Sequence, residues 1–167
     1  MDVEGIYRKS GGNSQVEHVR NGFEHPSPGF DLSDPDLDIH AVTSGLKQYF
    51  RKLPNPLITY DVYDELLDVT KIPDGPTQKV SRIEAMQKAL EELPRVHYYT
   101  LEYLIKHLAR VVTMEKENLM TSMNVAVVFA PTIMRPESLG RELSDTKMKN
   151  EVVMWMVEEA DRIFDQV

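Results

Sequence analysis

The sequence predicts an all-α fold, a multi-helix bundle built from a chain of 167 residues. Apolar residues recur at three- and four-residue intervals along the chain, and no stretch alternates clearly enough to predict a sheet. Apolar residues make up 41% of the sequence and charged residues 28%, as is typical of a globular domain with one core. Because each predicted helix is apolar on one side, packing the helices together buries those sides.

The first helix is predicted to begin at a capping box, because Ser14 and Glu17 have the required three-residue spacing. The prolines and glycine of residues 25–29 end this helix, and an acidic loop follows them. The apolar stripe of this helix is predicted to consist of Val16, Val19 and Phe23.

The second helix is predicted to begin after a cap supplied by Asp36 or Asp38. Pro54 and Pro56 end it, because proline lacks the amide donor and disfavours helix in the residue before it. The apolar residues that it carries are Ile39, Val42, Leu46, Tyr49, Phe50 and Leu53.

Five further helices are predicted from the same periodicity, and Val80 is placed on the apolar side of the second of them. The turn at residues 73–76 is too short to separate two domains, so residues 1–167 are predicted to form a single domain. We expect Pro131 to stop the fourth of these helices, which Thr121 caps. The first of the five begins after Thr59 and the third begins near residue 94. The second covers about residues 77–92, the fourth about residues 122–129 and the fifth about residues 146–164.

Composition argues against several classes of function. No apolar run approaches the roughly 18 residues of a membrane span, and no signal-peptide pattern is present. Cysteine is absent, which excludes disulfides, thiol catalysis and cysteine-ligated zinc, and the five histidines are too scattered to predict a metal site. The net charge of −8 argues against nucleic-acid binding. No GxxxxGK[ST] loop is present, so the chain is not predicted to hydrolyse nucleotides by itself.

Arg8 is the first candidate functional residue. Its guanidinium is permanently charged, and its fork of donors suits phosphate oxygens. Ile6 and Tyr7 can anchor one side of it, while Gly11 and Gly12 allow a tight bend that presents Arg8 outward. The alternative is a solvated surface arginine beside a glycine turn.

Lys47, Arg51 and Asn124 are further candidates. The spacing of Lys47 and Arg51 places both on one face of a helix, where they would face an acidic partner or support a loop through its carbonyl groups. The alternative is an ordinary polar helix face. Asn124 either caps a helix or satisfies backbone groups of the Arg8 loop or of a docked partner.

Three segments occur together in order: GIYRKSG at residues 5–11, LKQYFRKLPNPL at residues 46–57 followed by ITY, and NVAVVFAPTIM at residues 124–134. Together they closely resemble the catalytic core of the Rho GTPase-activating protein (RhoGAP) domain. By this resemblance Arg8 matches the family's arginine finger. Lys47 and Arg51 match the basic pair that supports the finger loop and contacts the GTPase, and Asn124 matches an asparagine at the partner interface.

The resemblance implies a module that stimulates GTP hydrolysis by Rho-family small GTPases in their GTP-bound form by supplying an arginine in trans. GTP and magnesium would belong to the partner, so no cofactor is expected in this chain. Met148 occupies a position where some relatives have a partner-contacting proline, and it would keep an apolar contact. The alternatives are a non-catalytic GTPase-binding module of the same fold and a generic helical scaffold.

The family normally has one or two helices before the finger motif, and residues 1–4 cannot replace them. The resemblance therefore implies a RhoGAP-type bundle that lacks the usual N-terminal helix or helices. We expect this lack to expose an apolar groove near Arg8, which would lower stability and favour self-association. The family also implies a cytoplasmic protein, recruited to membranes by other domains of a full-length protein.

Overall fold

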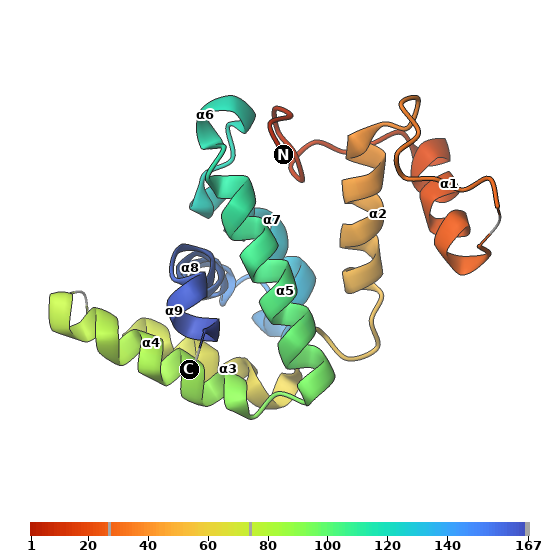
Figure 1. Ribbon diagram of the computed structural model, residues 1–167. Coiled ribbons are helices and arrows are strands. Elements are labelled where there is room, and N and C mark those ends of the chain that lie inside the picture. The colour runs from red at the N-terminus through yellow and green to blue at the C-terminus, as the bar shows by residue number, and fades with distance from the viewer. Residues whose placement is uncertain (27, 74, 166–167) are drawn as a thin grey trace.

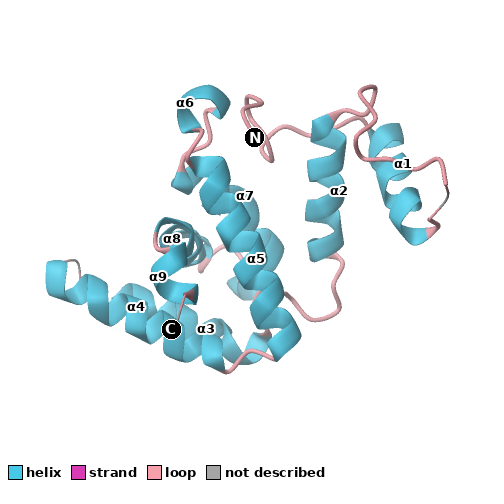
Figure 2. Cartoon of the chain, in the orientation of Figure 1, coloured by secondary structure: helices cyan, strands magenta, loops and turns pink. Residues whose placement is uncertain are grey.

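The structure, a computed structural model, describes residues 1–26, 28–73 and 75–165. Within these ranges every regular element is a helix, which confirms the all-α prediction (Figure 2). Ser27, in the predicted helix-ending segment, and Asp74, in the predicted turn, lie outside the described residues. The elements are α1 (Asn13–Glu24), α2 (Ile39–Arg51), α3 (Tyr60–Asp68), η1 (Val69–Lys71), α4 (Pro76–Glu91), α5 (Arg95–Val112), α6 (Glu115–Asn118), α7 (Ser122–Ile133), η2 (Leu139–Arg141), α8 (Thr146–Glu158) and α9 (Ala160–Phe164).

Helix α5 runs the length of the bundle and packs against α7, α8 and α9 (Figure 1). Helices α3 and α4 lie at its amino end, whereas α6 and the amino-terminal segment lie at the other end. Helix α2 contacts α7, and α1 packs on α2 at the side of the molecule. Among the described residues, no helix combines the length and apolar character needed to cross a membrane.

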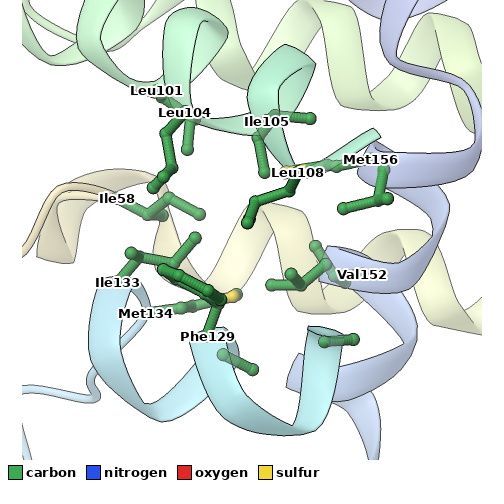
Figure 3. Close-up of a cluster of buried hydrophobic side chains, with 14 of the residues drawn as sticks. Ile58, Leu101, Leu104, Ile105, Leu108, Phe129, Ile133, Met134, Val152 and Met156 are labelled. Atoms are coloured by element: carbon green, nitrogen blue, oxygen red, sulfur yellow. The ribbon is translucent and has the colours of Figure 1, made fainter. Parts of the chain in front are cut away.

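The main core lies between α3, α4, α5, α7, α8 and α9. Figure 3 shows Leu101 of α5 pointing toward Ile58 and Leu108 of α5 pointing into the cluster between Phe129 of α7 and Val152 of α8, and all five are fully buried. A second, smaller cluster joins α1 to α2. Its buried members are Val16, Val19 and Ala41.

Two of the predicted helix caps are confirmed and one is wrong. The Asp38 carboxylate accepts a hydrogen bond from the His40 amide (2.9 Å), and Thr121 caps α7. Helix α1 begins after Gly12, which caps it without a side-chain bond, so Ser14 lies inside the helix and forms no capping box. The helix thus begins at Asn13, two residues earlier than a cap at Ser14 would allow.

Pro131 does not stop α7, which continues to Ile133. The missing proline amide removes one backbone bond near the end of the helix, while Met134 N still donates to Ala130 O (2.9 Å). Ile133 is fully buried, so the extra turn extends into the core. The last predicted helix is instead divided at Glu159 into α8 and α9.

Some residues predicted to pack are exposed. Tyr49 is 61% exposed and Phe23 64% exposed, so both lie beyond the edge of the stripe that their helix buries. Periodicity predicted where the long helices lie, but not all of their ends, and it made their buried stripes too wide. The complete set of such exceptions is Phe23, Ile39, Tyr49 and Val80.

Candidate functional site

Residues 5–11 form a compact loop that exposes Arg8. The amides of Arg8 and Lys9 both donate to the Gly5 carbonyl, at 2.9 and 2.8 Å. Gly5 has a φ of +70°, a conformation that glycine adopts without strain. Arg8 is exposed while the residue before it is buried, so the loop presents the guanidinium to solvent.

Tyr7 anchors this loop to the bundle. It is 5% exposed, and its ring makes an edge contact with Phe129 of α7 (5.1 Å between centroids). Its hydroxyl lies 2.6 Å from Nε2 of His107 on α5. Burial raises the pKa of Tyr7 to about 12, so the phenol keeps its proton at neutral pH. Its φ of +68° is uncommon for a residue with a side chain, and these contacts hold it there.

Lys47 supports the loop from α2. Its Nζ donates to the carbonyl oxygen of Tyr7 at 2.5 Å, and the side chain is buried. Burial, together with the nearby charge of Arg51, lowers the pKa of Lys47. The spacing of Lys47 and Arg51 left two arrangements open: facing an acidic partner, or supporting a loop through its carbonyl groups. Lys47 has the second arrangement.

Arg51 lies one turn further along α2 and is exposed, unlike Lys47. Its Nε donates to Oγ1 of Thr132 on α7 (3.2 Å), which directs the side chain across the α2–α7 contact. The guanidinium of Arg135 donates to the carbonyls of Arg51 (3.0 Å) and Leu53 (2.6 Å). Arg135 therefore fixes the end of α2, a role that sequence reasoning missed because its acceptors are backbone atoms.

The glycines after Arg8 have different roles. A Cβ on Gly11 would lie 2.4 Å from Cα of Ala41, so the loop approaches the α2 backbone too closely for a side chain. The Gly11 amide also donates to Oγ of Ser44 (3.1 Å). Gly12 faces open space and has an ordinary φ of −63°. We predicted that both glycines would be needed for the bend. In the structure only Gly11 is needed, because it lies close to the α2 backbone.

Asn118 of α6 holds the start of the loop, and sequence reasoning missed it. Its carbonyl accepts from the Gly5 amide (2.8 Å), and its side-chain amide donates to the carbonyls of Met1 (2.9 Å) and Val111 (2.8 Å). Asn118 is fully buried. It stands in a polar stretch of sequence, where nothing distinguishes it from a solvated asparagine.

Asn124 and Met148 are placed at helix starts. Oγ1 of Thr121 accepts from the Asn124 amide (3.1 Å) and donates to its side-chain oxygen (2.7 Å), so Asn124 takes part in the α7 cap. Met148, in the first turn of α8, is partly buried and packs against the main core. Of the predicted site residues, the structure directly connects the Arg8 loop with Lys47, and Asn124 with the α6–α7 turn.

The described residues contain no group of three side chains able to hold a metal ion. The site instead gathers cations: Lys47 lies beside Arg51 and binds the loop that carries Arg8, whose nearby Glu4 carboxylate pairs with Lys9. Such an arrangement can stabilise negative charge on a molecule docked against it.

The family model described as RhoGAP domain matches residues 1–138. The chain is 39% identical to Beta-chimaerin of Rattus norvegicus over 98% of this chain and 55% of that protein. It is 40% identical to N-chimaerin of Homo sapiens over 98% of this chain and 36% of that protein. The chain thus spans about half or less of these curated relatives.

Solved structures also share the fold, including the following two. Human Rho GTPase activating protein 15 matches with a TM-score of 0.88 and 32% identity, over 98% of this chain and 76% of that one. The BH domain of GRAF, the GTPase regulator associated with focal adhesion kinase, matches with a TM-score of 0.85 and 31% identity. That alignment covers 99% of this chain and 86% of the other.

Proposed function

The chain belongs to the RhoGAP domain family, and from this premise we propose that it stimulates GTP hydrolysis by Rho-family small GTPases in their GTP-bound form. Arg8 enters the partner's nucleotide site, and the chain does not hydrolyse GTP alone. GTP and magnesium belong to the partner. The names of its relatives, among them human Rho GTPase activating protein 15, support this activity.

The observation that carries the proposal is the contrast between Arg8 and the residue before it. Arg8 is exposed, whereas Tyr7 is held by Lys47 at its carbonyl and by His107 at its hydroxyl. Because the backbone at its base is fixed, Arg8 has only its side-chain rotamers left to order when it enters another active site. This supports a finger whose base is pre-positioned over an arginine on a mobile loop.

Phosphoryl transfer gains from such a group because negative charge spreads over the transferred phosphate in the transition state. A preorganised cation in a site without water stabilises that charge strongly. An arginine supplied in trans contributes roughly 10³–10⁵ in rate in the well-studied Ras case. We expect Arg8 to act in this way on the partner's γ-phosphate.

The other candidate residues either contact the partner GTPase or support the Arg8 loop. Lys47 holds the backbone before the finger, and the exposed Arg51 is available to carboxylates of a docked GTPase. Asn124 is half-exposed at the start of α7, where its amide can meet the partner's backbone. The exposed part of Met148 offers an apolar contact.

Single-turnover GTP hydrolysis by a Rho-family GTPase tests the proposal, with wild-type protein, Arg8→Ala and Arg95→Ala. Arg95 is a matched control because it is an exposed arginine at the amino end of α5, away from the Arg8 loop (Figure 1). We expect wild-type and Arg95→Ala proteins to accelerate hydrolysis equally. Arg8→Ala should lose about 10³-fold or more of the rate.

Two results would contradict the proposal in different ways. Equal acceleration by wild-type and Arg8→Ala proteins would show that another group acts on the phosphate. Binding to the GTP-loaded GTPase without acceleration by either protein would identify a non-catalytic binding module of the same fold.

A further inference from the structure

The contact between Tyr7 and His107 links the Arg8 loop to the longest helix of the bundle. Nε2 of His107 lies 2.6 Å from the Tyr7 hydroxyl, although the two residues are 100 positions apart in the sequence. Their rings meet edge to face, with centroids 5.8 Å apart. Because Tyr7 directly precedes Arg8, the place of its side chain helps to determine where the finger begins.

The direction of this hydrogen bond follows from proton counting. The Tyr7 phenol keeps its proton, since burial raises its pKa to about 12. Among the described residues, the acceptor found for that proton is Nε2 of His107. A neutral imidazole with its proton on Nδ1 satisfies both groups, whereas an imidazolium offers only donors and leaves the phenol proton without an acceptor.

We propose that neutral His107 is a positioning residue for Arg8, which accepts the Tyr7 hydroxyl and thereby fixes the backbone from which the finger extends. Protonation of His107 reverses this bond, because the imidazolium then donates to the phenol oxygen, and leaves the buried phenol proton without an acceptor. The loop is then held less firmly, so that the finger is less often in its productive place. The inference rests on the proposed function, because it concerns the delivery of the same arginine.

The groups that face the imidazole favour its neutral form. The Tyr7 hydroxyl and the ammonium of Met1 face it from the amino-terminal segment, and Arg110 faces it from its own helix. Burial comes first, and the positive charges of Arg110 and Met1 add to it, so the pKa of His107 lies below its usual 6.5. His107 is therefore neutral at pH 7 and becomes protonated only under more acidic conditions.

Activity gives the first test, in single-turnover assays across a pH series with the intrinsic rate of the GTPase subtracted. We expect His107→Phe and Tyr7→Phe each to slow stimulated hydrolysis about 10- to 100-fold, the range that a small misplacement of a catalytic group produces. Affinity for the GTP-loaded partner should stay unchanged, because the loss concerns the transition state. The double variant should be no slower than either single variant.

His107→Gln separates positioning from simple packing. Its amide oxygen can accept the Tyr7 hydroxyl but does not titrate, so the rate should recover and the acidic decline of the wild-type profile should disappear. His25→Gln and Tyr103→Phe are matched controls, because both residues are exposed and Tyr103 shares α5 with His107. Both should behave as wild type.

A second measurement needs no GTPase: NMR of the free protein during a pH titration. We expect the Arg8 amide signal to shift with the same midpoint as the His107 ring. Tyr7→Phe should raise that midpoint, because it removes a hydrogen bond to the neutral imidazole.

Two results would overturn the inference: an Arg8 signal that ignores the His107 titration, or full stimulation by His107→Phe. If wild-type protein fails to stimulate at all, the proposed function fails, while the titration still decides whether His107 positions the loop.

Discussion

The two sides of the Arg8 loop are held by different means. The side before Arg8 joins the main core, where Ile6 and Tyr7 are buried among residues of the large helices. The side after it rests on α2, through Gly11, beside the small cluster formed by Val16, Val19 and Ala41. The first attachment combines burial with two side-chain hydrogen bonds, whereas the second combines close backbone contact with one hydrogen bond, from the Gly11 amide to Ser44.

This difference indicates which side of the Arg8 loop is stiff. Burial of many apolar groups makes the main core, which includes Phe50 of α2, the most stable part of the molecule, whereas α1 is held by a cluster of three buried residues. We infer that α1 opens locally before the core does. The position of Arg8 is therefore set mainly from its amino side, and the predictions below test that asymmetry.

The largest effect on stability is expected from Phe129→Ala, on the core side. Phe129 is fully buried and contacts the Tyr7 ring, so its removal leaves a cavity in the core and under the loop. We expect a loss of about 3–5 kcal/mol in the free energy of unfolding, measured by denaturant titration. A change no larger than that of a surface substitution would contradict the described core.

Lys47→Met removes the cation from the Tyr7 carbonyl but keeps the length of the side chain. We expect stimulated hydrolysis to fall about 10- to 100-fold in single-turnover assays. The unsatisfied carbonyl should also lower the free energy of unfolding by about 1–3 kcal/mol, offset in part by the apolar replacement. Lys52→Met, an exposed neighbour, is the control, and equal behaviour of the two variants would refute the support role.

Gly11→Ala tests the other side of the loop. The added methyl group would meet the Ala41 backbone at 2.4 Å and must push the loop off α2. We expect a loss of about 1–3 kcal/mol from overpacking, with a lower melting temperature. Gly12→Ala provides the comparison: nothing lies within 4 Å of its new methyl group, so it should lose only the advantage of glycine over alanine as the N-cap of α1. Similar melting temperatures for both variants would show that the loop does not need a residue without a side chain at position 11.

Val19→Ala should weaken the small cluster by about 1.5 kcal/mol, the value of two buried methylene-sized groups. Native-state hydrogen exchange measures the effect locally. We expect amides of α1 to exchange faster, while those of α5 keep their protection. Uniform acceleration across both helices would show that α1 and the core open as one unit.

The smallest expected effect is a pH dependence of stability from His107. Its folded-state pKa lies below the usual value, so between the two values the unfolded chain binds more protons. Stability contributed by the neutral imidazole is complete above about pH 6.5 and is lost as the pH falls below it. Denaturant titrations at pH 7.5 and 5.5 should show a smaller decline for His107→Gln than for wild type. An equal decline would assign the pH dependence to other groups.

The sequence predicts the helices well because periodicity and capping are local properties. Asp38 and Thr121 act within three residues of their own positions, so a linear pattern reveals them. The burial of Lys47 could not be read in this way. Its acceptor on Tyr7 lies 40 residues away, and an isolated lysine on a helix predicts a solvated charge.

The rest of the site depends on contacts still more distant in sequence. His107 meets Tyr7 across 100 residues, and Asn118 reaches Met1 across 117. The resemblance to RhoGAP domains pointed to Arg8 and to Lys47 as a support of its loop, but it did not reveal that His107 and Asn118 also hold the loop. Those groups are ordinary polar residues whose function arises only when the bundle brings them together.

Binding to two states of a Rho-family GTPase tests the central claim most directly. One state holds a non-hydrolysable GTP analogue, and the other holds GDP with aluminium fluoride, which mimics the phosphoryl group in the transition state. If Arg8 acts on that group, Arg8→Ala should bind the first state almost as wild type does and lose most of its affinity for the second. Equal affinities of wild-type and Arg8→Ala proteins for the transition-state mimic would contradict the account.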